Sequence, residues 1–309
     1  MTPNLSPDLN LYGEHELMDM LAQNRADGLA PDPEQTLASS HLGQVAANIM
    51  QTALPDTLVG VNPEFKAQIA VSQELATQLF EPLGLVTPTT SELETQGIDF
   101  KRLNERYAAM EAAGAEPELV LAPSLALAEW RTVFKNLQDD PSVNTDGRIK
   151  NDGLWLADDV ANNWDSLMNQ ADNGTTATTS DGTQWHVALV PGTPKPSVVS
   201  IDAKGKDSSG NITPLLQARN TAYRDVPLQE ATLHPTIADY LTLQAGRLAM
   251  NQLPVDSETY TWLQGTFRVG NDLRAPRGFW LPDVGRVGLY WDEVDLRVDY
   301  LGVRLPVWG

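Results

Sequence analysis

The sequence predicts an α+β protein in which a helical part precedes a strand-rich part that carries the aromatic residues. All eight tryptophans lie from Trp130 onward, and the chain before them is rich in Ala, Leu, Gln and Glu. From about residue 115, short apolar runs alternate with Gly, Pro and Asp, a pattern typical of short strands. Helices that are segregated from a C-terminal antiparallel sheet define the α+β class.

The first predicted helix lies in residues 31–54. Leu37, Leu42 and Ile49 recur there at helical spacing, and Pro55 ends the pattern. The stripe indicates a helix that packs against others rather than a cofactor site.

Two further helices are predicted before residue 115. In residues 61–80, Asn62 can cap the helix and Pro63 suits its first position. A loop rich in Pro and Thr follows, and a third helix near 99–113 ends at Gly114.

The remainder begins with a strand and a helix. Residues 118–123 predict a buried strand, after which Ser124 caps a helix that carries Leu127, Trp130 and Phe134.

Shorter elements follow. Residues 153–159 and 185–192 are strand candidates on either side of a helix around 160–169, with a polar loop or hairpin tip between. A last helix occupies 237–250, and His234 beside Pro235 is interpreted as a residue at its start.

Composition limits the partners and the location. A formal net charge of -20 repels phosphate backbones and anionic lipid, so nucleic acid is not expected as a partner. The chain lacks a basic start followed by an apolar run, and no stretch of about 18 apolar residues predicts membrane insertion. We expect a protein made in soluble form. Export without a signal peptide and incorporation into a virus particle both stay open.

The residues that carry chemistry form no recognised pattern. The histidines His15, His41, His186 and His234 are scattered without the i, i+4 spacing of a helical zinc site, and the chain has no cysteine. Acidic pairs such as Asp139–Asp140 could supply the acid and base of a glycoside hydrolase, but such pairs arise often in an acidic chain. The sequence contains neither a phosphate loop nor a nucleophile elbow. We expect no enzyme activity, no cofactor and no metal.

The C-terminal segment from residue 274 carries large residues at both alternating sets of positions. One set is consistently apolar and predicts a core face: Trp280, Val287, Leu289, Trp291, Leu301, Val303 and Leu305. The other set, which includes Phe279, Gly288 and Asp292, follows no single theme. The second set forms either an exposed binding surface or the other side of a sheet that the chain covers on both faces.

An ordered string of motifs extends this observation. The string comprises "LVLAPSLALAEW", "GLWLADDVANNW", "WHVALVPGTPKP", "LHPTIADYLTLQAGRLAMNQLPVD" and the C-terminal "LRAPRGFWLPDVGRVGLYWDEVDLRVDYLGVRLPV". It resembles the variable proteins that diversity-generating retroelements diversify. The resemblance spans roughly residues 115–309 and implies a C-type-lectin fold of the formylglycine-generating-enzyme type. On this basis the chain divides into a helical region at 1–114, with no assigned role, and a ligand-binding domain at 115–309.

The resemblance also implies a variable region at about 274–304. Adenine-directed errors in AAC-like codons reach many residue types, but not Trp, Met, Lys, Gln or Glu. The implied variable positions all hold reachable residues: Phe279, Leu281, Val284, Gly288, Tyr290, Asp292, Leu296, Val298 and Tyr300. Trp280, Trp291 and Glu293 are not reachable, and they fall at framework positions.

The remaining residues of this region would form a scaffold, whose arginines can clamp carboxylates or loop carbonyls with forked hydrogen bonds. The implied scaffold residues are Arg274, Pro276, Arg277, Gly278, Trp280, Arg286, Trp291, Gly302, Arg304 and Pro306. The oxidase activity known for this fold depends on cysteine, which this chain lacks.

The sequence therefore predicts a non-enzymatic binding protein whose partner is a protein or another cell-surface ligand. Phe279, Leu281, Tyr290 and Tyr300 are the expected affinity anchors, and Asp292 is expected to tune charge complementarity. A phage particle component that recognises a host and, less favoured, a carbohydrate-active hydrolase are the alternatives.

Overall fold

A computed structural model describes residue 58 and residues 60–112, 116–170, 176–192, 217–219, 222–225, 234–304 and 306–308. The chain divides into two compact units, Met1–Ala38 and Ser39–Gly309, and every described residue belongs to the second unit. The helix expected at 31–54 lies outside the described residues. The boundary between the units does not coincide with the predicted boundary at residue 114, because Phe65 and Leu103 share one hydrophobic core with the rest of the second unit.

The second unit begins with helical elements. These are α3 (Pro63–Phe80), η2 (Glu81–Leu83), α4 (Thr90–Thr95) and α5 (Phe100–Ala112). The helix predicted at 61–80 is confirmed with its cap, since Asn62 Oδ1 accepts a 2.6 Å hydrogen bond from the backbone N–H of Phe65. The Pro- and Thr-rich segment is not simply a loop. It holds η2 and α4, because Thr89 and Glu92 form a reciprocal capping box.

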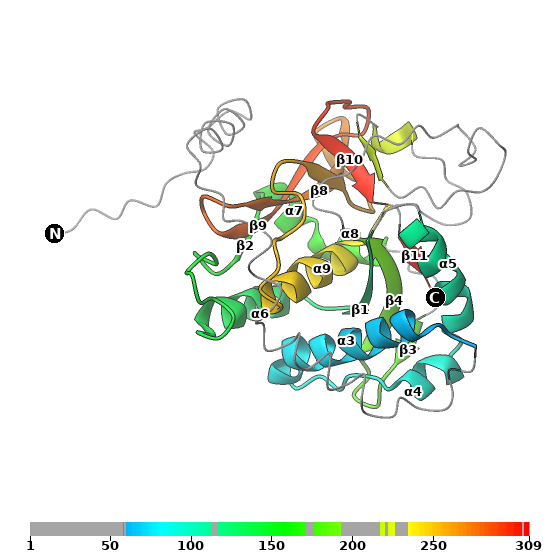
Figure 1. The fold of residues 1–309 in the computed structure, drawn as a ribbon. Coiled ribbons are helices and arrows are strands. Elements are labelled where there is room, and N and C mark those ends of the chain that lie inside the picture. Colours follow the sequence, from blue (N-terminus) through cyan, green and yellow to red (C-terminus); the bar gives the residue numbers. More distant parts are fainter. Residues whose placement is uncertain are drawn as a thin grey trace. The chain divides into compact units, whose positions relative to one another are not determined.

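A small sheet carries two of the predicted strands (Figure 1). It consists of β1 (Pro117–Pro123), β3 (Thr176–Thr178), β4 (Gln184–Pro191) and β11 (Val307–Trp308). The order is β1-β4-β11, β3 also pairs with β4, and all pairings are antiparallel. Three helices, α3, α5 and the later α9, contact this sheet.

The larger sheet is mixed rather than antiparallel throughout. It contains β2 (Leu154–Leu156), β5 (Gln217–Arg219), β6 (Tyr260–Trp262), β7 (Phe267–Val269), β8 (Asp272–Leu281), β9 (Arg286–Glu293) and β10 (Leu301–Arg304). The strand order is β2-β9-β8-β6-β10-β5, with β7 beside β8. The pairs β2·β9 and β10·β6 are parallel, which corrects the expected antiparallel sheet. The strands of each parallel pair are distant in sequence, so no local pattern predicts their direction.

The remaining helical elements are α6 (Leu127–Asp139), α7 (Asp158–Asn162), α8 (Trp164–Asn169), η3 (Tyr223–Asp225) and α9 (Ile237–Ala249). The cap predicted at Ser124 is wrong. Ala126 occupies the N-cap position, and its N–H donates to the Glu129 carboxylate at 2.7 Å. The helix expected around 160–169 is divided into α7 and α8.

Helix α9 lies between the two sheets, and all thirteen of its residues are buried (Figure 1). It contacts β1 and β4 of the small sheet, and Tyr240 on its other side meets Gly278 in β8. A helix that is covered on every side is usually apolar all round, but α9 also buries Asp239, Gln244 and Arg247, which find polar partners inside the protein. The predicted apolar stripe of Ile237, Leu241 and Leu248 is one part of this enclosure rather than the only buried face.

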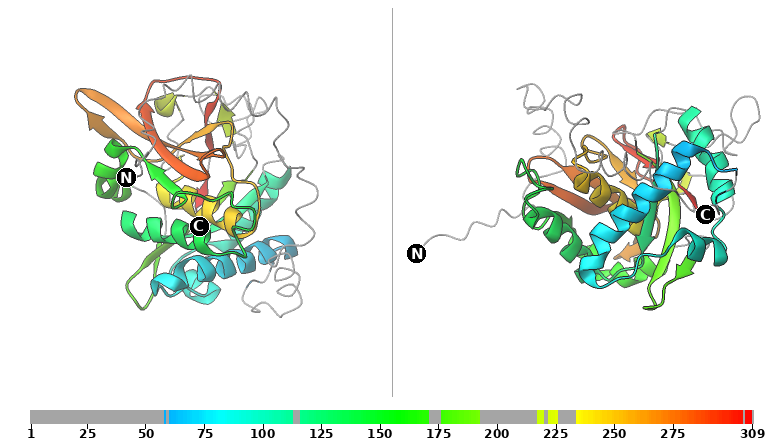
Figure 2. Two further views of the ribbon diagram at one scale, coloured as in Figure 1. Left: turned by 90° about the vertical axis from the view of Figure 1, so that its left-hand side faces the viewer. Right: turned by 60° about the horizontal axis from the view of Figure 1, so that its bottom comes forward.

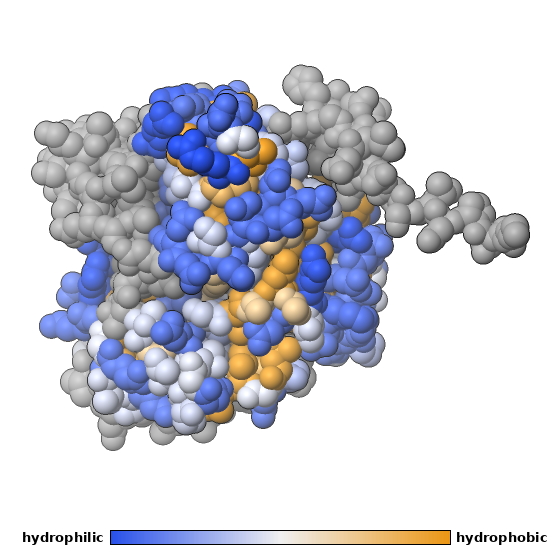
Figure 3. Space-filling model, turned by 180° about the vertical axis from the view of Figure 1, so that it is seen from behind, coloured by the Kyte–Doolittle hydropathy of each residue, from blue (hydrophilic) through white to orange (hydrophobic). Residues whose placement is uncertain are grey.

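The predicted α+β class is confirmed by these two sheets and their helices. Viewed from behind, the surface is largely hydrophilic, with an apolar strip between polar regions (Figure 3). In the described part of the chain, no helix combines the length and the apolar character that crossing a membrane requires.

Candidate functional site

The candidate site lies on one face of the hairpin formed by β8 and β9, which are labelled in Figure 1 and seen from two further sides in Figure 2. In this antiparallel pair, Phe279 is opposite Gly288 and Arg277 is opposite Tyr290. Residues that are opposite each other in a ladder point to the same side. We call this side the candidate face. The closed face is the other side of the hairpin, and it carries Gly278, Trp280, Val287 and Leu289.

The closed face packs on the core. Trp280, Val287 and Leu289 belong to the main hydrophobic cluster, as the alternation predicts. Gly278 lies so near α9 that a Cβ atom at this position would overlap the ring of Tyr240. Glycine is thus required for the approach of strand to helix.

The other members of the predicted core set differ in how far they are buried. Leu301 and Val303 are fully buried, as predicted. Trp291 is only partly buried, and Leu305 lies outside the described residues.

The candidate face gathers aromatic rings from four neighbouring strands. Trp155 of β2 stacks on Tyr290 of β9, with ring centroids 6.0 Å apart and planes 12° apart. Phe279 of β8 meets Tyr260 of β6 edge to face at 4.9 Å and is tilted against Trp155 at 6.4 Å. Ring pairs at these separations attract one another, and this attraction adds to the stabilisation that comes from burying their apolar surface.

An ion pair crosses this aromatic surface. Arg277 Nε lies 2.8 Å from Oδ2 of Asp292, and the two side chains are 4% and 16% exposed. The guanidinium of Arg277 also stands over the ring of Tyr260 at 4.1 Å and over that of Tyr290 at 5.2 Å. The aromatic faces and the carboxylate together compensate a cation that is almost removed from water.

Three of the predicted variable positions are buried. Phe279 and Leu281 are each 5% exposed, and Gly288 is also buried. This corrects the expectation that Phe279 and Leu281 are outward-facing affinity anchors. The ring of Phe279 is buried because it lies over the bare backbone of Gly288, between Trp155 and Tyr260.

The other six variable positions are partly exposed. They are Val284, Tyr290, Asp292, Leu296, Val298 and Tyr300. Val284 lies in the β8–β9 turn, whereas Leu296, Val298 and Tyr300 follow β9. Tyr300 makes an edge-to-face contact with Tyr260 at 5.4 Å, so the segment after β9 reaches the same aromatic group.

Sequence reasoning did not assign Trp155 or Tyr260 to this site. Trp155 enters through the parallel pairing of β2 with β9, where it is opposite Gly288. The sequence Leu154-Trp155-Leu156 is apolar at all three positions, so it does not show that Trp155 faces the other way from its buried neighbours.

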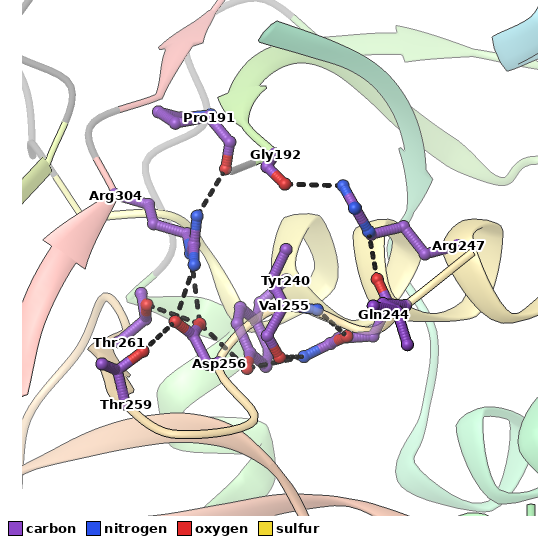
Figure 4. A network of polar contacts seen from close by, with 11 residues as sticks. Pro191, Gly192, Tyr240, Gln244, Arg247, Val255, Asp256, Thr259, Thr261 and Arg304 are labelled. Atoms are coloured by element: carbon purple, nitrogen blue, oxygen red, sulfur yellow. Dashed lines mark hydrogen bonds and ion pairs between the residues drawn. The ribbon is translucent and has the colours of Figure 1, made fainter. Parts of the chain in front are cut away.

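Beneath the hairpin, Arg304 makes the forked clamp that was predicted for scaffold arginines (Figure 4). Its Nη2 and Nε donate to the two carboxylate oxygens of Asp256 at 2.7 and 3.1 Å, and its Nη1 donates to the carbonyl of Pro191 at 2.9 Å. Both side chains of the ion pair are fully buried. The clamp joins β10, the end of β4 and the segment that follows α9.

Further donors complete the surroundings of Asp256. The hydroxyls of Thr259, Thr261 and Tyr240 donate to its carboxylate at 2.9, 2.7 and 3.2 Å. Burial, together with the charge of Asp256, raises the pKa of Tyr240 well above its usual value. Tyr240 therefore remains a neutral hydrogen-bond donor.

The network extends along α9 (Figure 4). Gln244 donates to the Tyr240 hydroxyl at 2.7 Å and to the carbonyl of Val255 at 2.9 Å. Arg247 pairs with Glu118 of β1 and donates to the carbonyl of Gly192 at 2.6 Å. Polar contacts thus tie both sheets to the same helix.

Two of the histidines, His186 and His234, are buried. His186 Nδ1 lies 3.1 Å from Oδ1 of Asp239, and both side chains are fully buried. Burial alone would raise the pKa of Asp239, but His186 and Thr236 hold it below its ordinary value. His234 stacks on Tyr223 at 4.1 Å, and burial lowers its pKa to about 3. The described residues contain no group of three or more His, Asp or Glu that could hold a metal ion.

Comparison of the chain with protein-family models, with curated proteins and with solved structures gives no match.

Proposed function

We propose that the chain is a non-enzymatic ligand-binding protein that displays a variable surface on the β8–β9 hairpin and the segment up to Tyr300. The observation that carries the proposal is the difference between the two faces of the hairpin. The closed face is fixed by the core and by the contact of Gly278 with Tyr240, while the candidate face has Tyr290 and Asp292 partly exposed. Sequence change is therefore expected at the partly exposed positions of the candidate face, and not on the closed face.

The identity of the exposed residues supports a retroelement as the source of the variation. The six partly exposed positions all hold residues that adenine-directed changes of AAC-like codons can produce. Trp280 and Trp291, which such changes do not produce, lie on the closed face. The proposal includes the C-type-lectin fold that the resemblance implies for residues 115–309.

The partner of this surface is a protein or another cell-surface molecule. Tyrosine and tryptophan dominate binding energies at interfaces, and Trp155, Tyr290 and Tyr300 offer three partly exposed rings. The clamp of Arg304 keeps the supporting strands in place before binding, so less side-chain and loop order has to form in the complex.

The first test is the DNA around the gene. We expect a near-copy of the segment that encodes about residues 274–304, differing at adenines, beside a gene for a reverse transcriptase. A locus without both would remove the retroelement from the proposal.

The second test measures tolerance to substitution on the intact chain. A library at the six partly exposed positions, sorted by resistance of the folded protein to protease, should retain nearly every reachable residue type. A matched library at Trp280, Val287, Leu289 and Arg304 should lose most of them, because these side chains are buried. Equal tolerance in the two libraries would contradict the proposal that the partly exposed positions vary while the buried positions do not.

A further inference from the structure

Phe279 and Gly288 cannot change independently. A Cβ atom built on Gly288 would lie 2.5 Å from both Cε2 and Cζ of the Phe279 ring and 3.0 Å from Cε1. Carbon atoms in proteins pack at about 3.5 to 4.0 Å, so any side chain at position 288 has to displace the ring. The two residues are opposite each other in the β8–β9 ladder, so the backbone pairing holds the Phe279 side chain next to position 288.

The space that the ring fills has defined walls. Gly288 forms its floor, Tyr260 meets the ring edge to face at 4.9 Å, and Trp155 is tilted against it at 59°. The Phe279 side chain is only 5% exposed in this position. The walls come from three different strands, β9, β6 and β2, so they do not depend on Phe279 for their position in the sheet.

We propose that this space is a subsite for one planar aromatic ring and that positions 279 and 288 act as a unit that opens or fills it. In this chain the subsite is filled by the protein's own Phe279. A small residue at position 279, with glycine kept at 288, opens it to an aromatic side chain of a partner. Any larger residue at 288 closes it again. The inference rests on the proposed function, because positions 279 and 288 lie within the variable region at about 274–304 that the resemblance implies.

The chemistry of the walls sets the ligand class. Tyr260 and Trp155 present ring faces and edges, which favour another aromatic ring over a saturated ring of similar size. The guanidinium of Arg277 covers the ring of Tyr260 at 4.1 Å and is held by Asp292, so this wall stays in place when the Phe279 ring is removed. Toluene, which reproduces the side chain of phenylalanine, is the appropriate probe, and methylcyclohexane is its saturated counterpart.

The first experiment adds the probe to the full-length variant Phe279→Ala. We expect the melting temperature to fall by about 10 °C, because a buried aromatic ring is lost. Toluene at ten times its Kd should then restore about 3 °C, and methylcyclohexane should restore much less. The unchanged protein should respond to neither.

The matched control is the double variant Phe279→Ala, Gly288→Val. Its new side chain occupies the space above position 288, so toluene should no longer raise its melting temperature. No recovery by toluene in Phe279→Ala, or equal recovery in the double variant, would overturn the subsite.

The second experiment is a double-mutant cycle on stability. Gly288→Ala should lower the melting temperature of the unchanged protein by several degrees, yet leave that of Phe279→Ala unchanged or higher, because the clashing ring is absent. Strictly additive effects would overturn the coupling. If Phe279→Ala does not fold, Phe279→Val provides the same cycle with a shortened side chain.

The two proposals fail in different ways. Additive effects and an unresponsive Phe279→Ala would remove the subsite while the genomic test of a retroelement still stands. A locus without the near-copy would remove the retroelement, whereas the coupling of positions 279 and 288 is measured on the protein alone.

Discussion

Two arginine–aspartate pairs of the same chemistry occupy opposite environments in this molecule. Arg304 and Asp256 are both fully buried, and the neighbours of Asp256 include three hydroxyl donors. Arg277 and Asp292 stand on the candidate face, with Asp292 16% exposed and the arginine lying over two tyrosine rings. The first pair joins β10 to the segment that follows α9, while the second joins neighbouring strands of one hairpin.

The two environments indicate where the stability of this fold depends on a particular residue. A buried charge that loses its partner has no water to replace it, so each member of the inner pair requires the other. In the outer pair, Asp292 has partial access to water, and two tyrosine rings continue to attract the Arg277 cation. We therefore expect the inner pair to determine stability and the outer pair to tolerate change.

The largest effect is expected for Asp256→Ala. The variant leaves the Arg304 guanidinium uncompensated inside the protein and removes the acceptor of three hydroxyl groups. We expect a loss of about 3 to 5 kcal/mol of unfolding free energy, measured by chemical denaturation. A loss below about 1 kcal/mol would show that water or another group replaces the carboxylate.

A second effect concerns the aromatic layer beside the outer pair. His234 stacks on Tyr223, which contacts Trp262, the residue opposite Arg277 in the β6–β8 ladder. The pKa of His234 is about 3 in the folded protein, below the ordinary value near 6.5, so the unfolded chain binds the proton more readily. This contribution to stability is complete above pH 6.5 and is lost as the pH falls toward 3.

The expected loss is about 2 kcal/mol between pH 7 and pH 5, measured by denaturant unfolding at each pH. His234→Phe keeps a ring against Tyr223 and removes the titrating group, so its stability should change less over the same range. An identical pH dependence in both proteins would assign the effect to other groups.

Asp292→Ala is the direct counterpart of Asp256→Ala. We expect it to lower the unfolding free energy by about 1 kcal/mol, because the Arg277 cation keeps its contacts with Tyr260 and Tyr290. The comparison of the two pairs fails if denaturation gives equal losses for both variants.

The smallest effects are expected at Leu296 and Val298. Both side chains are only partly buried in the segment after β9. Replacing either residue by Asn should change the unfolding free energy by no more than about 0.5 kcal/mol, or the melting temperature by about 1 to 2 °C. A loss comparable to that of Asp256→Ala would place these residues in the framework.

Local chemistry explains which parts of the fold were predictable. The helix α3 followed from Asn62 and Pro63, and the strand β1 followed from a short apolar run, because caps and periodicity act within a few residues. The sequence also predicted that scaffold arginines clamp carboxylates or carbonyls with forked hydrogen bonds, as Arg304 does. It did not predict Asp256 as the partner of Arg304.

The candidate face was predicted less well, because its burial depends on segments that are distant in sequence. The pattern of the hairpin alone separates its two sides correctly, yet it does not say that Trp155 and Tyr260 cover Phe279. Gly288 was predicted as a member of the mixed set and as a variable position. Gly288 matters because it has no side chain, which allows the ring of Phe279 to lie over its backbone.

The complete enclosure of α9 has a consequence for motion. This helix contacts both sheets and has no residue exposed to solvent, so its amide hydrogens have no local route to exchange. They should exchange with deuterium only when the whole second unit unfolds, which makes α9 the slowest described element to label. A substitution that loosens only the hairpin surface should then leave the exchange rates of the α9 amides unaltered. These rates would serve as an internal reference when surface variants are compared.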